Sequence, residues 1–299
     1  MLCARIGIPW IKDVGRPLLM TGAFAAEVAA PVFEIGHFVP QLIHSPSCVR
    51  LVKLDDSSLP HLRWNRYEGF VNAKFFEEQR REMVATIRAI AEHIAAELGK
   101  TALDERVLMA MAKVPRHEFV PVEVQSYAYL NRPIPIGFDK TISQPLMVAV
   151  MTDLLELKAD DMVLEIGTGL GYQSAVLAEL AGKVYSVEII DELAQRAKQR
   201  LNRRGYTNVE VRIGNGYTGW PNHAPFDKVM VTAAPDLIPP PLINQLKAGG
   251  RMVIPVGLLS AQQLVVVEKD LNGRITTKEI MPVLFSVLEG SDQPAFRAS

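Results

Sequence analysis

The chain has few cysteines, no metal-like spacing of histidines and no excess of charge of either sign. Its two cysteines, Cys3 and Cys48, both lie near the start of its 299 residues, and its six histidines are scattered. We therefore expect a reducing compartment and no metal. Lysine and arginine total 32 against 33 aspartates and glutamates, and this balance disfavours nucleic acid as the main partner.

Long apolar runs are also missing, so no membrane partner is expected. Residues 17–26 are mostly apolar and follow Arg5, Lys12 and Arg16, an arrangement faintly similar to an export signal. The apolar stretch is short and interrupted, however, and Asp13 lies upstream of it. We expect a cytoplasmic protein.

What the chain does have is an apolar fraction of 48%, which is ample for a core, and a change of pattern near residue 73. Residues 1–72 show no sustained period, and we expect this N-terminal extension to be poorly ordered or not part of the core. The main domain is expected over 73–299. It divides into a helical and loop subregion, 73–140, and a core, 141–290.

Helical spacing of apolar residues predicts a helix from residue 73 to residue 98, where Gly99 ends it. Thr101 and Asp104 resemble a capping box that opens a second helix, which Pro115 ends. A loop is expected from there to residue 140.

The rest of the chain alternates short apolar runs with helical stretches. This alternation predicts an α/β fold with a doubly wound, mostly parallel sheet, helices on both faces, and ligands at the carboxyl ends of the strands. The expected strands are 162–166, 184–188, 209–213, 228–232, 251–255 and 263–268, and the expected helices are 145–156, 172–181, 190–204 and 240–247.

The most informative segment runs from Val163 to Tyr172, where an apolar run ends in Gly167, Gly169 and Gly171. This pattern is typical of a buried strand entering a tight turn, where the backbone approaches a ligand closely before a helix begins. In the dinucleotide fingerprint the third glycine comes three residues after the second, but here it comes two residues later.

Two acidic residues favour a cationic ligand. Glu165 lies in the strand just before the turn, where an anionic pyrophosphate would be a poor neighbour. Glu188 closes the next apolar run, about twenty residues after the first glycine, where such folds bind a ribose diol. Together they favour S-adenosyl-L-methionine, which carries an ammonium and a sulfonium. A strand, turn and helix without a ligand is the poorer interpretation, because the second acidic residue stands at the right distance.

The segment from Thr141 to Pro145 precedes the helix that leads into the first strand. Its simplest interpretation is that Ser143 caps this helix and Pro145 occupies the first turn. Free N–H groups at a helix start also attract anions, so the same geometry can hold a carboxylate. The two interpretations are compatible.

These motifs make the chain resemble the protein-L-isoaspartate O-methyltransferase family over roughly residues 83–290. The glycine trio is shared by many methyltransferases. The segments 115–121 and 141–145 are more specific, and they occur in the order and spacing of this family. Further matching segments are 133–137, 164–173, 224–227, 231–235 and 245–257.

The resemblance implies a Rossmann-like methyltransferase fold with an N-terminal helical extension. It also implies methyl transfer from S-adenosyl-L-methionine to the free α-carboxylate of L-isoaspartyl residues in damaged proteins and peptides, which are the expected partners. The methyl ester then collapses to a succinimide, whose hydrolysis restores some normal linkage. No general base is needed, because a carboxyl with a pKa of about 4 is already ionised at neutral pH. A monomer is favoured.

The resemblance also implies roles for particular residues. Ser143 would be the catalytic residue that orients the substrate carboxylate, with Thr141 and Ile142 forming the wall of the substrate site. Glu165 would lie near the cofactor ammonium and Glu188 at the ribose. The implied cofactor-binding residues are Glu165, Gly167, Gly169, Gly171, Tyr172, Gln173, Glu188, Asn215 and Gly216, the last two flanking adenine.

Two positions depart from the family pattern. Asn215 stands where the family usually has aspartate, and since an amide oxygen still accepts a hydrogen bond, we predict weakened cofactor binding rather than its loss. Residues 285–288 read Phe-Ser-Val-Leu, where the family commonly has Phe-Val-Pro-Leu in its closing strand. This change affects the shape of the substrate cleft.

Two alternatives stay open. A methyltransferase for a small molecule or nucleobase is one, but enzymes that methylate nucleobase amines usually carry Asn/Asp-Pro-Pro-aromatic after the fourth strand, and residues 232–236 lack that motif. A cofactor-binding module with impaired catalysis is the other, suggested by Asn215 and by Ser286 and Val287. An active enzyme is preferred, because the residues expected around the methyl group are all present.

Overall fold

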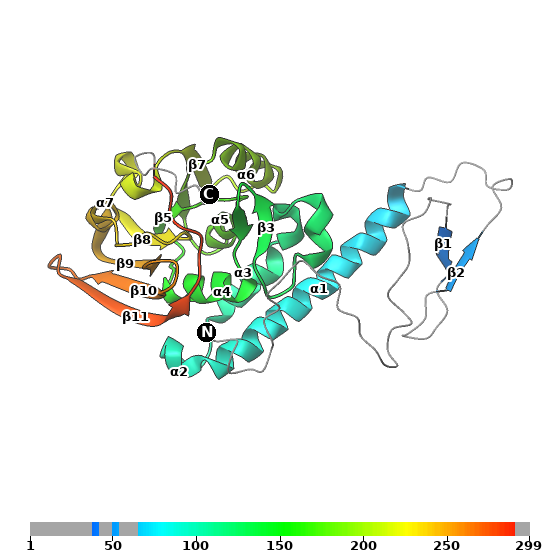
Figure 1. Cartoon of the computed structure of the whole chain (residues 1–299), viewed down its shortest axis with the longest axis horizontal. Coiled ribbons are helices and arrows are strands. Elements are labelled where there is room, and N and C mark those ends of the chain that lie inside the picture. Colours follow the sequence, from blue (N-terminus) through cyan, green and yellow to red (C-terminus); the bar gives the residue numbers. More distant parts are fainter. Residues whose placement is uncertain (1–37, 42–49, 54–64, 291–299) are drawn as a thin grey trace. The chain divides into compact units, whose positions relative to one another are not determined.

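The structure is a computed structural model that describes residues 38–41, 50–53 and 65–290, with side chains from residue 73 onward. The chain forms two compact units, Met1–Phe70 and Val71–Ser299, and each is described by itself (Figure 1). Most of the predicted extension, residues 1–72, lies outside the described residues, so its separate character stays a prediction.

In the first unit, strands β1 (Phe38–Gln41) and β2 (Arg50–Lys53) pair in antiparallel fashion. In the second unit, seven strands form a sheet in the order β11-β10-β9-β8-β5-β6-β7. The strands from β5 to β9 run parallel, and β10 pairs antiparallel with both of its neighbours. This topology confirms the predicted α/β fold with a mostly parallel, Rossmann-like sheet. The strands are β5 (Met162–Ile166), β6 (Lys183–Glu188), β7 (Val209–Ile213), β8 (Phe226–Val231), β9 (Leu246–Val256), β10 (Gln262–Lys269) and β11 (Ile275–Val283).

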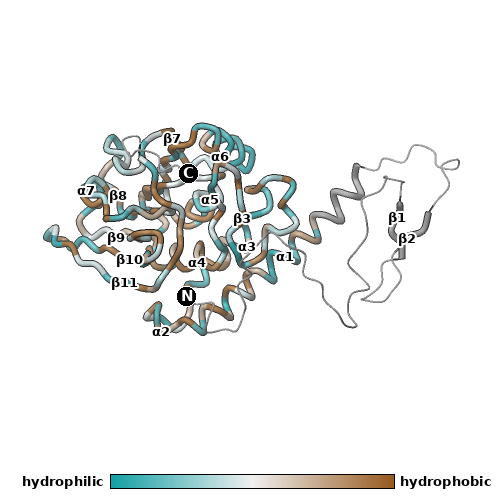
Figure 2. The backbone as a smooth tube through the Cα atoms, in the orientation of Figure 1, coloured by the Kyte–Doolittle hydropathy of each residue, from teal (hydrophilic) through white to brown (hydrophobic). Residues whose placement is uncertain are grey.

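Alternate residues of the central strands bury opposite faces of the sheet. Val163 and Val184 belong to a core shared with α1, α3, α4, α5 and α6, whereas Leu164 and Val187 belong to a second core with α7. Figure 2 shows hydrophobic residues along the central strands and hydrophilic ones along α6. The helices are α1 (Asn65–His93), α2 (Ala95–Leu98), α3 (Glu105–Lys113), α4 (Pro145–Leu154), α5 (Tyr172–Ala178), α6 (Asp191–Arg203) and α7 (Pro240–Asn244).

Several element ends differ from the prediction by a few residues, and three differences have a clear structural cause. The helix expected over 73–98 is divided, because Ile94 leaves helical geometry between α1 and α2. The expected capping box at Thr101 is wrong, since Asp104 caps α3 by accepting a 2.8 Å hydrogen bond from the Arg106 N–H. Helix α7 ends before residue 247, because Leu246 already pairs with β8 at the start of β9.

Three further strands lie where a loop was expected or where nothing was predicted. Strands β3 (Ile134–Gly137) and β4 (Lys140–Ile142) form a short hairpin that begins inside the expected loop and ends just beyond it. Strand β11 escaped prediction because residues 276–279, at its centre, are all exposed and polar, so it carries little apolar signal there.

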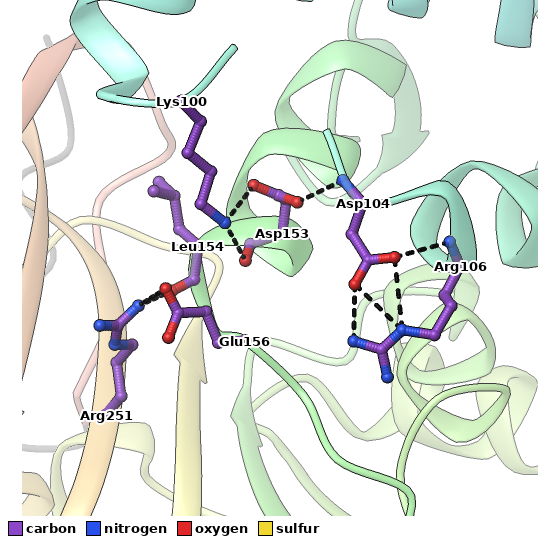
Figure 3. Close-up of polar contacts among 7 residues, drawn as sticks. All are labelled: Lys100, Asp104, Arg106, Asp153, Leu154, Glu156 and Arg251. Atoms are coloured by element: carbon purple, nitrogen blue, oxygen red, sulfur yellow. Dashed lines mark hydrogen bonds and ion pairs between the residues drawn. The ribbon is translucent and has the colours of Figure 1, made fainter. Parts of the chain in front are cut away.

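Helix α4 is anchored at its carboxyl end by a buried carboxylate. Asp153 is 3% exposed and accepts hydrogen bonds from Lys100 Nζ at 2.9 Å and from the Asp104 N–H at 2.7 Å (Figure 3). Arg251 of β9 pairs with Glu156, just beyond the helix, at 2.6 Å. These contacts fix the carboxyl end of α4 against the start of α3 and against β9.

Candidate active site

A pocket lies at the carboxyl ends of β5, β6 and β8, where the fold predicts a ligand. Its walls come from the turn after β5, the end of β6, the β3–β4 hairpin, and the segments that follow β7, β8 and β11. The lining residues are Ile136, Lys140, Thr141, Ile166, Gly167, Gly169, Val187, Glu188, Ile189, Leu193, Gly216, Thr232, Ala233, Ser286, Val287, Leu288 and Glu289.

The pocket brings together some of the predicted site residues and leaves others outside its lining. Those that line it are Thr141, Gly167, Gly169, Glu188 and Gly216. Those outside the lining are Ile142, Ser143, Glu165, Gly171, Tyr172, Gln173 and Asn215. The assigned roles of both groups stay predictions, and the contacts of each group are described below.

Glycine is required at the first position of the turn after β5. Gly167 has a φ of +94°, and a Cβ there would collide with the side-chain oxygen of Thr232. That oxygen donates to the carbonyls of Gly167, at 2.8 Å, and Ile166, at 3.0 Å, although a single hydroxyl proton serves one of them at a time. Thr232 was missed as a site residue. Thr232 is the last residue of the predicted strand 228–232. Ligands are expected at the carboxyl ends of the strands, so this position was the signal that could have identified it.

Glu188 lies at the end of β6 with its carboxylate in the pocket wall. One oxygen accepts from the Gly169 N–H at 2.7 Å, and the other accepts from the Ile190 N–H at 3.0 Å. Burial raises the pKa of Glu188, whereas these backbone hydrogen bonds and the charge of Lys140 act to lower it. Each oxygen keeps a lone pair, so this carboxylate is suited to accept from a pair of ligand hydroxyls.

Glu165 lies beneath the turn and joins three elements of the fold. It is fully buried, and one of its oxygens accepts from the hydroxyls of Ser174, in α5, and Ser186, in β6, the latter at 2.6 Å. The Ser186 oxygen lies 2.5 Å from the Thr168 hydroxyl within the turn. Glu165 therefore supports the shape of the turn, and burial raises its pKa to about 7.

This buried carboxyl should make stability depend on pH. Because its pKa rises from 4.5 to about 7 on folding, its neutral form stabilises the folded chain below about pH 4.5. That contribution is lost as the pH rises through 7, at a cost of about 3 kcal/mol. We expect urea unfolding at pH 5 and pH 8 to show this loss in the wild-type protein and not in Glu165→Gln. Glu279→Gln, on exposed β11, is the control, and equal pH slopes for wild type and Glu165→Gln would contradict the prediction.

The residues after the turn pack α5 into the core. Gly171, with a φ of +94°, precedes the helix, and the ring of Tyr172 is 2% exposed. Gln173 donates to the Thr152 hydroxyl at 2.9 Å, which joins α5 to α4. In these positions Tyr172 and Gln173 support the helix start.

Ser143 is held in place through its backbone carbonyl. The buried Arg116 guanidinium donates to the Ser143 carbonyl at 2.7 Å and to the Ala128 carbonyl at 2.7 Å. The expected helix cap at Ser143 is wrong, because Gln144 is the residue at the cap position and makes no side-chain capping bond. Among the described residues, the Ser143 hydroxyl has no hydrogen-bond partner.

The segments after β7 and β11 close the remaining wall. Asn215 accepts from the Tyr217 N–H at 2.9 Å and so starts a 3₁₀ turn. A Cβ at Gly216 would come within 2.5 Å of Ile166, so only glycine fits beside the end of β5. Residues 285–288 are the segment that departs from the closing-strand pattern of the family. They follow β11, and Val287 forms an isolated parallel bridge with Ala234.

Within residues 73–290, no three His, Cys, Asp or Glu side chains are grouped as metal ligands. The helices in the described part of the chain are all too short or too polar to cross a membrane. Cys3 and Cys48 lie outside the described residues.

A Rossmann-like sheet with a glycine turn after its central strand and a carboxylate at the end of the next strand defines the class of a nucleoside-binding methyltransferase. The family model of protein-L-isoaspartate(D-aspartate) O-methyltransferase matches residues 90–293. The chain belongs to this family.

Known relatives and solved structures are similar to this chain over most of the region that the family model matches. Protein-L-isoaspartate O-methyltransferase 1 of Polaromonas sp. is 63% identical over 224 residues, which cover 75% of this chain and 95% of the relative. Protein-L-isoaspartate O-methyltransferase 2 of Syntrophobacter fumaroxidans is 58% identical, covering 71% and 86%. A solved protein-L-isoaspartate O-methyltransferase is 28% identical with a TM-score of 0.62, covering 71% of this chain and 66% of that chain. A Plasmodium falciparum structure in complex with S-adenosyl-L-homocysteine, 23% identical with a TM-score of 0.55, shares the fold and covers 62% and 91%.

Proposed function

We propose that this protein transfers a methyl group from S-adenosyl-L-methionine to the free α-carboxylate of L-isoaspartyl residues in damaged proteins and peptides, which starts their repair through a succinimide. Family membership supports this activity. The observation that carries it is that one pocket is lined by Gly167, Gly169 and Glu188 and also by Thr141. Thr141 is the first residue of the family segment 141–145. A cytoplasmic location and a monomeric state are parts of the same proposal.

The residues of the pocket fit the proposed cofactor. The carboxylate of Glu188 has acceptor capacity for ribose hydroxyls, and the missing side chains at Gly167 and Gly216 leave the backbone close to the ligand. When bound, S-adenosyl-L-methionine supplies an electrophilic methyl group on a positively charged sulfur.

The protein then only has to bind and orient the two reactants. The substrate carboxylate is already ionised, so no side chain has to remove a proton. Ser143 would donate its hydroxyl to one carboxylate oxygen and orient the other toward the methyl carbon, at about 3 Å. A new C–O bond forms as the C–S bond breaks, and the electron pair stays on sulfur. The walls from β4 and the segment after β11 would exclude water that screens the opposite charges.

We expect Glu188→Ala to weaken cofactor binding by about 1.5 to 3 kcal/mol, because charged hydrogen bonds to the ribose would be lost. Calorimetric titration with S-adenosyl-L-methionine measures this change, with Glu210→Ala on exposed β7 as the control. Because Glu188 also accepts from two backbone N–H groups, a cofactor analogue without ribose hydroxyls is needed. This analogue should bind the wild-type protein more weakly than S-adenosyl-L-methionine does. It should bind Glu188→Ala with the same affinity as S-adenosyl-L-methionine. An unchanged dissociation constant in Glu188→Ala would remove the proposed role.

The proposed function is tested by methyl ester formation on an isoaspartyl peptide and on its ordinary aspartyl twin. Labelling of the isoaspartyl peptide alone is the expected result, and equal labelling would contradict the specificity. Cofactor binding is measured beside turnover, because binding without turnover on any peptide would instead favour the module with impaired catalysis.

A further inference from the structure

Two walls of the pocket are joined by an ion pair between residues that lie 149 positions apart in the chain, Lys140 and Glu289. Lys140 begins β4 and directly precedes Thr141. Glu289 follows the segment that Val287 bridges to Ala234 beyond β8. Both partners line the pocket, so their charges act on whatever ligand enters it.

Lys140 is the one cationic residue among the described residues that line the pocket. The other charged lining residues, Glu188 and Glu289, both carry carboxyl groups. The proposed substrate is itself an anion, and carboxylates in the wall would repel it. The charge of Lys140 also acts to lower the pKa of Glu188, which places the ammonium within electrostatic reach of the cofactor side of the pocket.

The Glu289 carboxylate can dissociate easily from the Lys140 ammonium. The Glu289 side chain is 55% exposed, whereas that of Lys140 is 22% exposed, so the carboxylate is the outer member of the pair. Glu289 has no other hydrogen bond or ion pair with the described residues. Ion pairs with such exposure are held weakly, because water competes for both charges. A carboxylate from outside can therefore replace it at small cost.

We propose that Lys140 is a substrate-recognition residue that binds the α-carboxylate of the isoaspartyl residue, and that Glu289 occupies this position on Lys140 in the free protein. The same oxygen of the substrate carboxylate that accepts from the Ser143 hydroxyl also accepts from the Lys140 ammonium, and the other oxygen stays available to the methyl group. Recognition by Lys140 selects an anionic group next to the segment 141–145. This inference rests on the proposed function and names the residue that selects its substrate.

The test compares the two members of the pair, because substrate recognition predicts opposite effects for them. Lys140→Gln should raise KM for an isoaspartyl peptide about tenfold or more, as expected for a lost hydrogen bond between charged groups. Glu289→Gln should lower KM, by up to about fivefold, because the competing carboxylate is gone. Lys140→Arg should restore most of the affinity for the peptide. The dissociation constant of S-adenosyl-L-methionine, measured separately, should change much less than KM in all three variants.

A purely structural ion pair would give a different result, since either substitution would then raise KM by a similar factor. That outcome, or an unchanged KM in Lys140→Gln, would overturn the inference while leaving the proposed function intact. Lys247→Gln is the matched control, because it removes a lysine from an exposed ion pair with Asp227, 2.7 Å apart, outside the pocket lining. Absence of methyl transfer by the unaltered protein would overturn the proposed function, and this inference with it.

Discussion

Replacing Gly167 by alanine should weaken binding of S-adenosyl-L-methionine by about 100-fold or more. The residue has a φ of +94°, where a side chain adds strain of about 1–3 kcal/mol. The new Cβ would also collide with the Thr232 hydroxyl, which donates to the carbonyls of Gly167 and Ile166. The turn can relieve this collision only by moving, and its movement changes the pocket wall that the cofactor would contact.

The variant Gly205→Ala is a control that introduces the backbone strain of a positive φ without changing the pocket. Gly205 also has a positive φ, +78°, but no atom lies within 4 Å of the Cβ that alanine would add, and it follows α6 away from the pocket lining. We expect this control to lose about 1 kcal/mol of stability and to bind the cofactor normally. Calorimetric titration and urea unfolding of both variants provide the comparison. Equal cofactor affinity in the two variants would show that the turn does not shape the site.

Ser143→Ala should lower kcat by about 100- to 1,000-fold, the usual effect of losing one donor that orients or stabilises the reacting group. Its hydroxyl has no partner among the described residues, and Gln144 occupies the cap position of α4. Alanine therefore removes nothing that the fold needs, and the Arg116 bond to the Ser143 carbonyl remains. Stability and cofactor affinity should stay close to those of the wild-type protein.

The measurement is the rate of methyl ester formation at saturating peptide and cofactor, with the cofactor dissociation constant measured separately. Ser126→Ala is the control, because Ser126 is an exposed serine outside the pocket lining. Wild-type turnover in Ser143→Ala would leave this hydroxyl without a role, because the structure gives it no capping function. A parallel loss of cofactor affinity would point to a change of fold instead.

The strands that build the site could be predicted closely from the sequence. The predicted range 162–166 is the observed range of β5, and the glycine turn follows it directly. Both signals are local, because an apolar run and a set of glycines constrain the backbone wherever the chain later packs. The specific segment 141–145 likewise gave the family, which the comparisons confirm.

The short hairpin and the edge strand could not be predicted in the same way. Strands β3 and β4 span four and three residues, too few to show a period, and residues 276–279 of β11 are exposed and polar. Each is stabilised as a strand by its pairing partner, through a register that the local sequence does not reveal.

By itself, the sequence determined the parallel strands, the glycine turn with Glu188 about twenty residues beyond it, and the family of the chain. Only the tertiary structure decided that Glu165 is buried against Ser174 and Ser186, that the Ser143 hydroxyl has no partner within residues 73–290, and that Lys140 pairs with Glu289. The reason is physical. Backbone preferences and apolar periods act between near neighbours in the chain, whereas burial and ion pairing depend on which distant segments the packed core brings into contact.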